Sequence, residues 1–130
     1  MFYSRELTIP PQTTVEAPYV QTLALARGVI AQLWVRWYYG SGNLCGVRFK
    51  LNEFAYWPMT LGEWIPSSVY PLAIPENYTL QVQPMTLRIE AFNLDDVFAH
   101  GLWVAVAVLR AKKTGQLDEF LTWIAGQSGA

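Results

Sequence analysis

Apolar residues alternate with polar ones along most of this chain, in short runs separated by prolines, glycines and Asn or Asp clusters. When the runs are compared with periods of 2.0 and 3.6 residues, almost all fit the period of 2, which is typical of β-strands with one buried face. The main runs are residues 6–9, 19–26, 29–38, 45–51, 85–92 and 98–110. The pattern therefore predicts an all-β fold.

The run 29–38 divides into two faces and is followed by a turn signal. Val29, Ala31, Leu33, Val35 and Trp37 share the face that we expect to be buried, and Ile30, Gln32, Trp34, Arg36 and Tyr38 share the other. Gly40-Ser41-Gly42-Asn43 has the composition of a tight hairpin. We therefore expect run 45–51 to pair antiparallel with run 29–38 and to point Cys45, Val47, Phe49 and Leu51 inward.

The run 98–110 is apolar on both faces, with Leu102, Val104, Val106 and Val108 on one side and Trp103, Ala105, Ala107 and Leu109 on the other. A strand of this kind is covered on both sides. Either it is central and overlaid by another segment of the chain, or its second face meets a neighbouring subunit.

Two regions depart from regular alternation. Between residues 52 and 84, five prolines and many aromatics predict ordered loop, with short strands only near 54–57 and 79–82. After residue 110, Leu117, Phe120, Leu121 and Ile124 have the i, i+3, i+4, i+7 spacing of a short amphipathic helix. A helix of about ten residues is not stable alone in water, so it must dock on its own sheet or on another protein.

These elements predict an antiparallel β-sandwich or jelly roll of about seven to eight strands, with a short C-terminal amphipathic helix. The 130 residues suffice for one core but not for two. We assign residues 1–110 to the β-sandwich domain and residues 111–130 to a tail with the helix.

Composition points toward association. Hydrophobic residues make up 52% of the chain, above the roughly 45–50% usual for globular domains, although the usual figure includes glycine and this one does not. Something beyond the core of a monomer therefore needs covering. Nine basic against ten acidic residues leave a net charge of -1, which favours neither a nucleic acid nor an anionic membrane as partner. The N-terminus lacks the pattern of a signal peptide, and no apolar run approaches the roughly twenty residues of a membrane span.

Candidate chemistry is sparse. Asp95, Asp96 and His100 are the one titratable cluster, but Asn-Leu-Asp-Asp is typical of a turn whose side chains bond the local backbone. His100 is expected at a strand end on the surface or in an interface, and Cys45 is expected to be a buried, unreactive thiol. We therefore expect a non-enzymatic protein with no catalytic residues, no cofactor and no metal site.

Two functions remain. The first is self-assembly through an aromatic and aliphatic surface, because protein interfaces favour Tyr, Trp, Phe, Met and Arg. We expect a homo-oligomer, preferably a trimer, with an interface that includes Trp34, Tyr38, Trp103, Leu117, Phe120, Leu121 and Ile124. The alternative is a carbohydrate-binding module that stacks a glycan on the loop aromatics Tyr56, Trp57, Trp64 and Tyr70.

A resemblance favours assembly. Leu7-Thr8-Ile9-Pro10, the segments 18–25 and 27–36, and the stretch 87–100 with its pattern Glu-Ala-x-Asn-x-Asp-Asp-x-x-x-His resemble small β-sandwich structural proteins of tailed bacteriophages and related viruses. The resemblance covers about residues 6–110, and its motifs are turns and strands. It implies a capsid decoration or accessory subunit that is made in the host cytoplasm and resides in the virion, with a viral shell or another virion protein as partner. The tail from Ala111 departs from that group.

Overall fold

The described part of the chain is made of β-strands. The structure, a computed structural model, describes residues 1–38, 40–51, 55–58, 63–68, 70–80 and 85–109, of which the side chains of 55 and 56 are left aside. The strands are β1 (Phe2–Ile9), β2 (Tyr19–Leu25), β3 (Gly28–Trp37), β4 (Cys45–Leu51), β5 (Ala55–Trp57), β6 (Ile65–Pro66), β7 (Leu72–Leu80), β8 (Met85–Asn93) and β9 (His100–Leu109). The all-β prediction is confirmed for these residues, and the predicted tail helix lies outside them.

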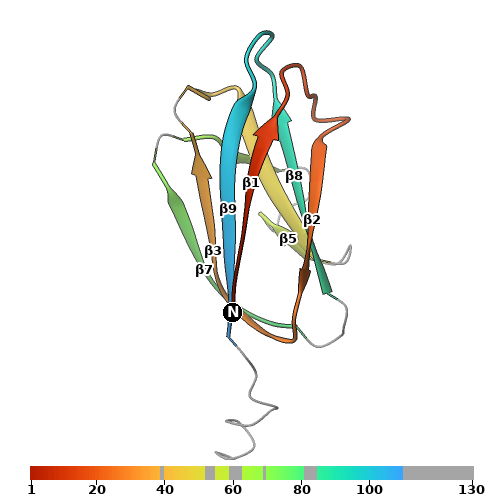
Figure 1. The fold of residues 1–130 in the computed structure, drawn as a ribbon, viewed down its shortest axis with the longest axis vertical. Helices are drawn as coiled ribbons and strands as arrows, with labels where there is room; N and C mark the ends of the chain where they lie inside the picture. Colours follow the sequence, from red (N-terminus) through yellow and green to blue (C-terminus); the bar gives the residue numbers. More distant parts are fainter. Residues whose placement is uncertain (39, 52–54, 59–62, 69, 81–84, 110–130) are drawn as a thin grey trace, which may run out of the picture.

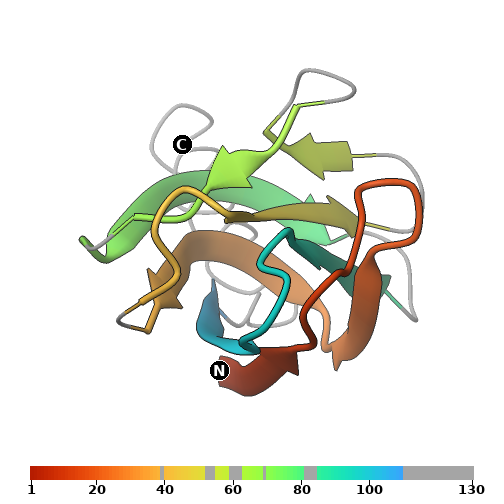
Figure 2. The same ribbon diagram turned by 90° about the horizontal axis from the view of Figure 1, so that it is seen from above.

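The strands form two antiparallel sheets that pack face to face as a β-sandwich (Figures 1 and 2). Sheet A has the order β1-β9-β3-β7. Sheet B has the order β2-β8-β4-β5, and the two-residue β6 also pairs with β4. The β-sandwich is therefore confirmed, and β9 has the interior position in its sheet that its doubly apolar sequence indicates.

The strand order is that of one long hairpin folded over on itself. When the two-residue β6 is left aside, strands equally far from the two ends of the hairpin pair with each other: β1 with β9, β2 with β8, β3 with β7, and β4 with β5. Pairing of β3 with β9 and of β4 with β8 then joins the hairpin pairs into the two sheets. Each sheet thus combines strands from both halves of the chain.

The expected hairpin between residues 29–38 and 45–51 is wrong. β3 pairs with β7 and β9, while β4 pairs with β5, β6 and β8, so the two strands lie in different sheets. The connection after Trp37 crosses from one sheet to the other instead of turning back within one. β3 and β4 each have a hydrogen-bonded strand on both edges, and the partners on one edge of each, β9 and β8, lie far along the sequence.

Two further strand predictions need correction. A register shift between Ile30 and Gln32 changes the phase of β3, so Ile30 is buried together with Leu33, Val35 and Trp37, while Val29 and Ala31 are only half-buried. An extra residue in a strand reverses the faces on one side of it. The strand expected at 79–82 is instead β7, which begins at Leu72 and runs through Pro75. Pro75 is tolerated because β7 is an edge strand.

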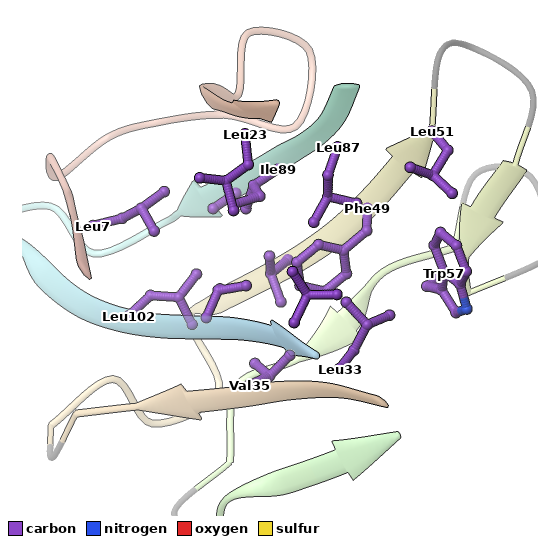
Figure 3. Close-up of a cluster of buried hydrophobic side chains, with 14 of the residues drawn as sticks. Leu7, Leu23, Leu33, Val35, Phe49, Leu51, Trp57, Leu87, Ile89 and Leu102 are labelled. Atoms are coloured by element: carbon purple, nitrogen blue, oxygen red, sulfur yellow. The ribbon is translucent and has the colours of Figure 1, made fainter. Parts of the chain in front are cut away.

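The core lies between the sheets and takes side chains from both. Figure 3 shows Leu33, Val35 and Leu102 of sheet A facing Phe49 and Ile89 of sheet B. The predicted inward set of β4 is confirmed, because Cys45, Val47, Phe49 and Leu51 are all at most 1% exposed. The alternate residues of the same strands point away from this core, so they decide what the two outer faces of the sandwich present.

Candidate assembly surface

The outer face of sheet A is aromatic at its centre. Because Leu102, Val104, Val106 and Val108 of β9 point into the core, Trp103, Ala105 and Ala107 point outward. The register places Ala107 opposite Phe2 of β1 and Ala105 opposite Trp34 of β3. We call the set Phe2, Trp34, Trp103, Ala105 and Ala107 the aromatic face.

The rings of the aromatic face contact one another across three strands. The centroid of the Phe2 ring lies 5.7 Å from that of Trp34 and 6.5 Å from that of Trp103, both tilted. Ala105 is fully buried although it is on the outer side of the sheet, because the larger side chains beside it cover its methyl group. Phe2 itself is 59% exposed, so this cluster presents a large apolar ring to solvent.

Polar and charged groups border the aromatic face. Trp103 lies opposite Glu6 on one side and Arg36 on the other. The Tyr38 hydroxyl donates to Glu6 Oε1, and the guanidinium of Arg36 lies 5.9 Å from the centre of the Tyr38 ring. This hydrogen bond to a carboxylate raises the pKa of Tyr38. An apolar centre with a polar border is the usual anatomy of a protein interface.

Gly101 explains why Tyr38 can lie at this border. A Cβ at Gly101 would come within 2.2 Å of Tyr38 Cδ2, and the backbone N–H of Tyr38 donates to the carbonyl oxygen of Gly101 at 3.0 Å. The missing side chain lets the Tyr38 ring pack directly on the backbone of β9.

The structure gathers part of the interface predicted from sequence. Trp34 and Trp103 lie in the aromatic face, and Tyr38 lies at its border. Phe2 was missed, because alternation within residues 1–9 does not reveal that β1 pairs with β9. The other predicted interface residues, Leu117, Phe120, Leu121 and Ile124, lie outside the described residues.

The aromatics of the glycan alternative whose side chains are described differ in exposure. Trp57 is 5% exposed, and its Nε1 donates to Glu76 Oε2 at 2.5 Å, which lowers the pKa of Glu76. Trp64 is half-buried, with the Arg48 guanidinium 4.2 Å from its ring centre and Phe92 packed edge-on. Tyr70 is 78% exposed, and the Tyr56 side chain is not among those described. Trp57 is therefore not available for stacking in this conformation.

A cavity of about 220 Å³ opens at the edge of the sandwich, where β3 and β7 face β6. Of the three candidate aromatics whose side chains are described, Tyr70 alone is among its lining residues. The buried Trp37 also lines it, and Trp37 Nε1 has no hydrogen-bond partner in the described part of the chain. The lining residues are Val35, Trp37, Ile65, Pro66, Ser68, Tyr70, Pro71 and Leu72.

The titratable cluster after β8 holds a loop in place. Asp95 Oδ1 accepts hydrogen bonds from the backbone N–H groups of Val97 (2.9 Å) and Phe98 (3.2 Å), and Asp95 Oδ2 bonds His100 Nε2 at 2.9 Å. These bonds lower the pKa of Asp95, with Val97 as the largest cause. His100 begins β9, which confirms the expected strand-end position, but it is 8% exposed and therefore buried instead of lying on the surface, with its ring bonded to Asp95.

Asn93 completes this loop. Its Nδ2 donates to the carbonyl oxygens of Ile9 (3.1 Å) and Phe98 (2.9 Å), while its Oδ1 accepts from the backbone N–H of Asp95 and from Cys45 Sγ. Cys45 is buried as expected, and burial raises the pKa of its thiol to about 11. The side chains of Asn93, Asp95 and His100 are therefore engaged in hydrogen bonds that fix the loop.

Neither the described residues nor the sequence comparisons add a further kind of site. Among the described residues, no group of three or more His, Cys, Asp or Glu is arranged to hold a metal ion. The same residues contain no helix that is long and apolar enough to cross a membrane. No protein-family model matches the chain, and no curated protein matches its sequence.

Proposed function

We propose that this protein is a non-enzymatic structural subunit that assembles with copies of itself through the aromatic face, as part of a viral shell. The observation that carries the proposal is the cluster of Phe2, Trp34 and Trp103 on the outside of sheet A, with a 59% exposed phenylalanine at its centre. Exposed apolar clusters with a polar border mark interaction surfaces. Closed symmetric oligomers, here preferably a trimer, are the usual result.

The strand order supports the viral assignment. Without the short β6, the orders β1-β9-β3-β7 and β2-β8-β4-β5 match a jelly roll made by rolling up an eight-stranded hairpin. Jelly rolls are found in viral capsid proteins, in lectins and in cupins. A fold of this breadth does not decide function, so the proposal rests on the aromatic face and on the bacteriophage resemblance of residues 6–110.

The test is the mass of the purified protein by light scattering across a concentration series. We expect wild type to form a closed oligomer, preferably at three times the monomer mass of 14.7 kDa. Trp103→Asp should shift the mass toward the monomer, because a carboxylate would be buried in an apolar contact. Phe2→Asp is the second variant, since Phe2 is more exposed and its replacement disturbs the fold less.

Tyr70→Asp is the matched control, because it also replaces an exposed aromatic but lies away from the aromatic face. A wild-type protein that stays monomeric at every concentration would contradict the proposal. A folded Phe2→Asp variant with the mass of wild type would contradict the assignment of the surface.

A further inference from the structure

β2 is an edge strand without the features that normally protect edges. It pairs with β8 in a continuous register from Tyr19 opposite Ala91 to Leu25 opposite Met85, and with no other described strand. Its sequence, Tyr-Val-Gln-Thr-Leu-Ala-Leu, contains no charge, proline or glycine. Its outer edge therefore presents backbone N–H and C=O groups in a straight row, the arrangement to which another extended strand can add.

The other described edge strands differ from β2. β1 carries Arg5 and Glu6, and β7 contains Pro75 followed by Glu76. β5 has only three residues. Charges, prolines and short length are the usual means by which proteins prevent pairing at sheet edges. Among the described edge strands, these protective features are thus missing from β2, which forms one edge of sheet B in Figure 1.

We propose that β2 pairs antiparallel with β2 of a second copy across a two-fold axis, which joins two B sheets into one continuous sheet. The axis that pairs the most residues passes through Thr22, the middle residue of the strand. Val20 then lies opposite Ala24 of the other copy, and Gln21 lies opposite Leu23.

This register is self-complementary on the outer face, and on the core-facing side it sets the half-buried Gln21 opposite Leu23. Val20, Thr22 and Ala24 are exposed, whereas Leu23 and Leu25 are buried, and the pairing keeps exposed residues opposite exposed ones. No charge meets a like charge across the axis. Two charged residues of β8 face β2 on the outer side, Arg88 opposite Thr22 and Glu90 opposite Val20, and Arg88 Nε donates to Glu90 Oε2 at 2.5 Å. A second copy of this chain therefore fits the edge.

The inference rests on the proposed self-assembly and adds a second, separate contact to it. The aromatic face lies on sheet A, and β2 forms the edge of sheet B. A two-fold contact at β2 would link the oligomers made by the aromatic face, as a growing shell requires. Substitutions in β2 should therefore stop this linking and leave the aromatic-face oligomer intact.

The test is Thr22→Lys, with Thr79→Lys as its matched control. Both threonines are exposed on edge strands, but Thr79 lies on β7, beyond Pro75. Thr22→Lys would place two ammonium groups opposite each other at the two-fold axis, and like charges directly opposite destabilise a strand pair. We expect Thr22→Lys to reduce the largest species to the mass of the aromatic-face oligomer, and Thr79→Lys to leave it as in wild type.

A mixing experiment separates loss of pairing from damage to the fold. Thr22→Lys and Thr22→Glu should each fail to pair alone, whereas an equal mixture should restore the full mass. In hydrogen exchange, the amides of β2 should become more protected as the wild-type concentration rises, and those of Thr22→Lys should not.

The outcomes separate this inference from the proposed function. Wild-type mass and unchanged β2 exchange in Thr22→Lys would overturn the β2 contact and leave assembly through the aromatic face standing. A folded 1:1 mixture that does not recover the full mass would also overturn it. A wild-type protein that is monomeric throughout would overturn both.

Discussion

Asn93 shows how much a single side chain can organise in this protein. Its amide bonds the backbone at Ile9, Asp95 and Phe98 as well as the Cys45 thiol, so it joins the ends of β1 and β8 to the loop before β9. The loop is fixed further by Asp95, which bonds Val97, Phe98 and His100. Val97 and Phe98 nevertheless remain 69% and 66% exposed. The sequence predicted a turn here, but four bonds to one amide require the tertiary arrangement.

The Asp95 bonds predict a pH dependence of stability. The pKa of Asp95 is lowered in the folded protein by the N–H of Val97 and by His100, so the unfolded chain takes up this proton first as the pH falls. The stabilisation is complete above the usual carboxyl pKa of about 3.9 and disappears as the pH falls through the lower folded value. In thermal melts, wild type should exceed Asp95→Asn in melting temperature at neutral pH, with the difference shrinking in acid. A difference that is constant with pH would contradict this role.

At the scale of elements, alternation identified strands best where they are regular and central. β4 follows its predicted inward face, and β9 has the interior position that its two apolar faces indicated, because each has sheet neighbours on both sides. β7 was missed over most of its length, since prolines normally interrupt a strand and only its edge position allows Pro75. The bulge in β3 could not be predicted from alternation. It is a register shift between Ile30 and Gln32 in the pairing with both β7 and β9, and the sequence of β3 alone does not contain those pairings.

The tail predicts a separation between folding and assembly. If the apolar residues within 117–124 contribute to association, deletion of residues 116–130 should leave the melting temperature nearly unchanged, because the described strands of the sandwich end by Leu109. The same deletion should abolish or strongly reduce the oligomer measured by light scattering. Loss of the cooperative melting transition would show instead that the tail is needed for the fold, and an unchanged oligomer would show that it is dispensable for assembly.

At the scale of the whole molecule, the two outer faces differ in chemistry. Sheet A presents the aromatic face, whereas sheet B presents Arg48 and Arg88, both bonded to the buried carboxylate of Glu90 at 2.6 and 2.5 Å. Burial alone would raise the pKa of Glu90, but the two guanidinium groups outweigh it and lower that pKa. A sandwich with one apolar and one ion-paired face suits a subunit that is buried on one side only.

The nested strand order predicts slow folding. β1 pairs with β9 and β2 pairs with β8, so most sheet contacts require residues from opposite ends of the chain to meet. Proteins dominated by such distant contacts fold on the order of milliseconds to seconds. Refolding from urea, followed by tryptophan fluorescence at a concentration where the chain is monomeric, should fall in this range. Folding within microseconds would indicate that local contacts dominate.

The sequence by itself determined the all-β class, the inward face of β4 and the burial of Cys45. These properties follow from local alternation and composition, which do not depend on strand partners. Only the tertiary structure decided that β3 and β4 lie in different sheets, that Phe2 joins Trp34 and Trp103, and that β2 is an unprotected edge. The physical reason is that pairing in this sandwich joins distant strands, and no local pattern states which strand completes the hydrogen bonds of another.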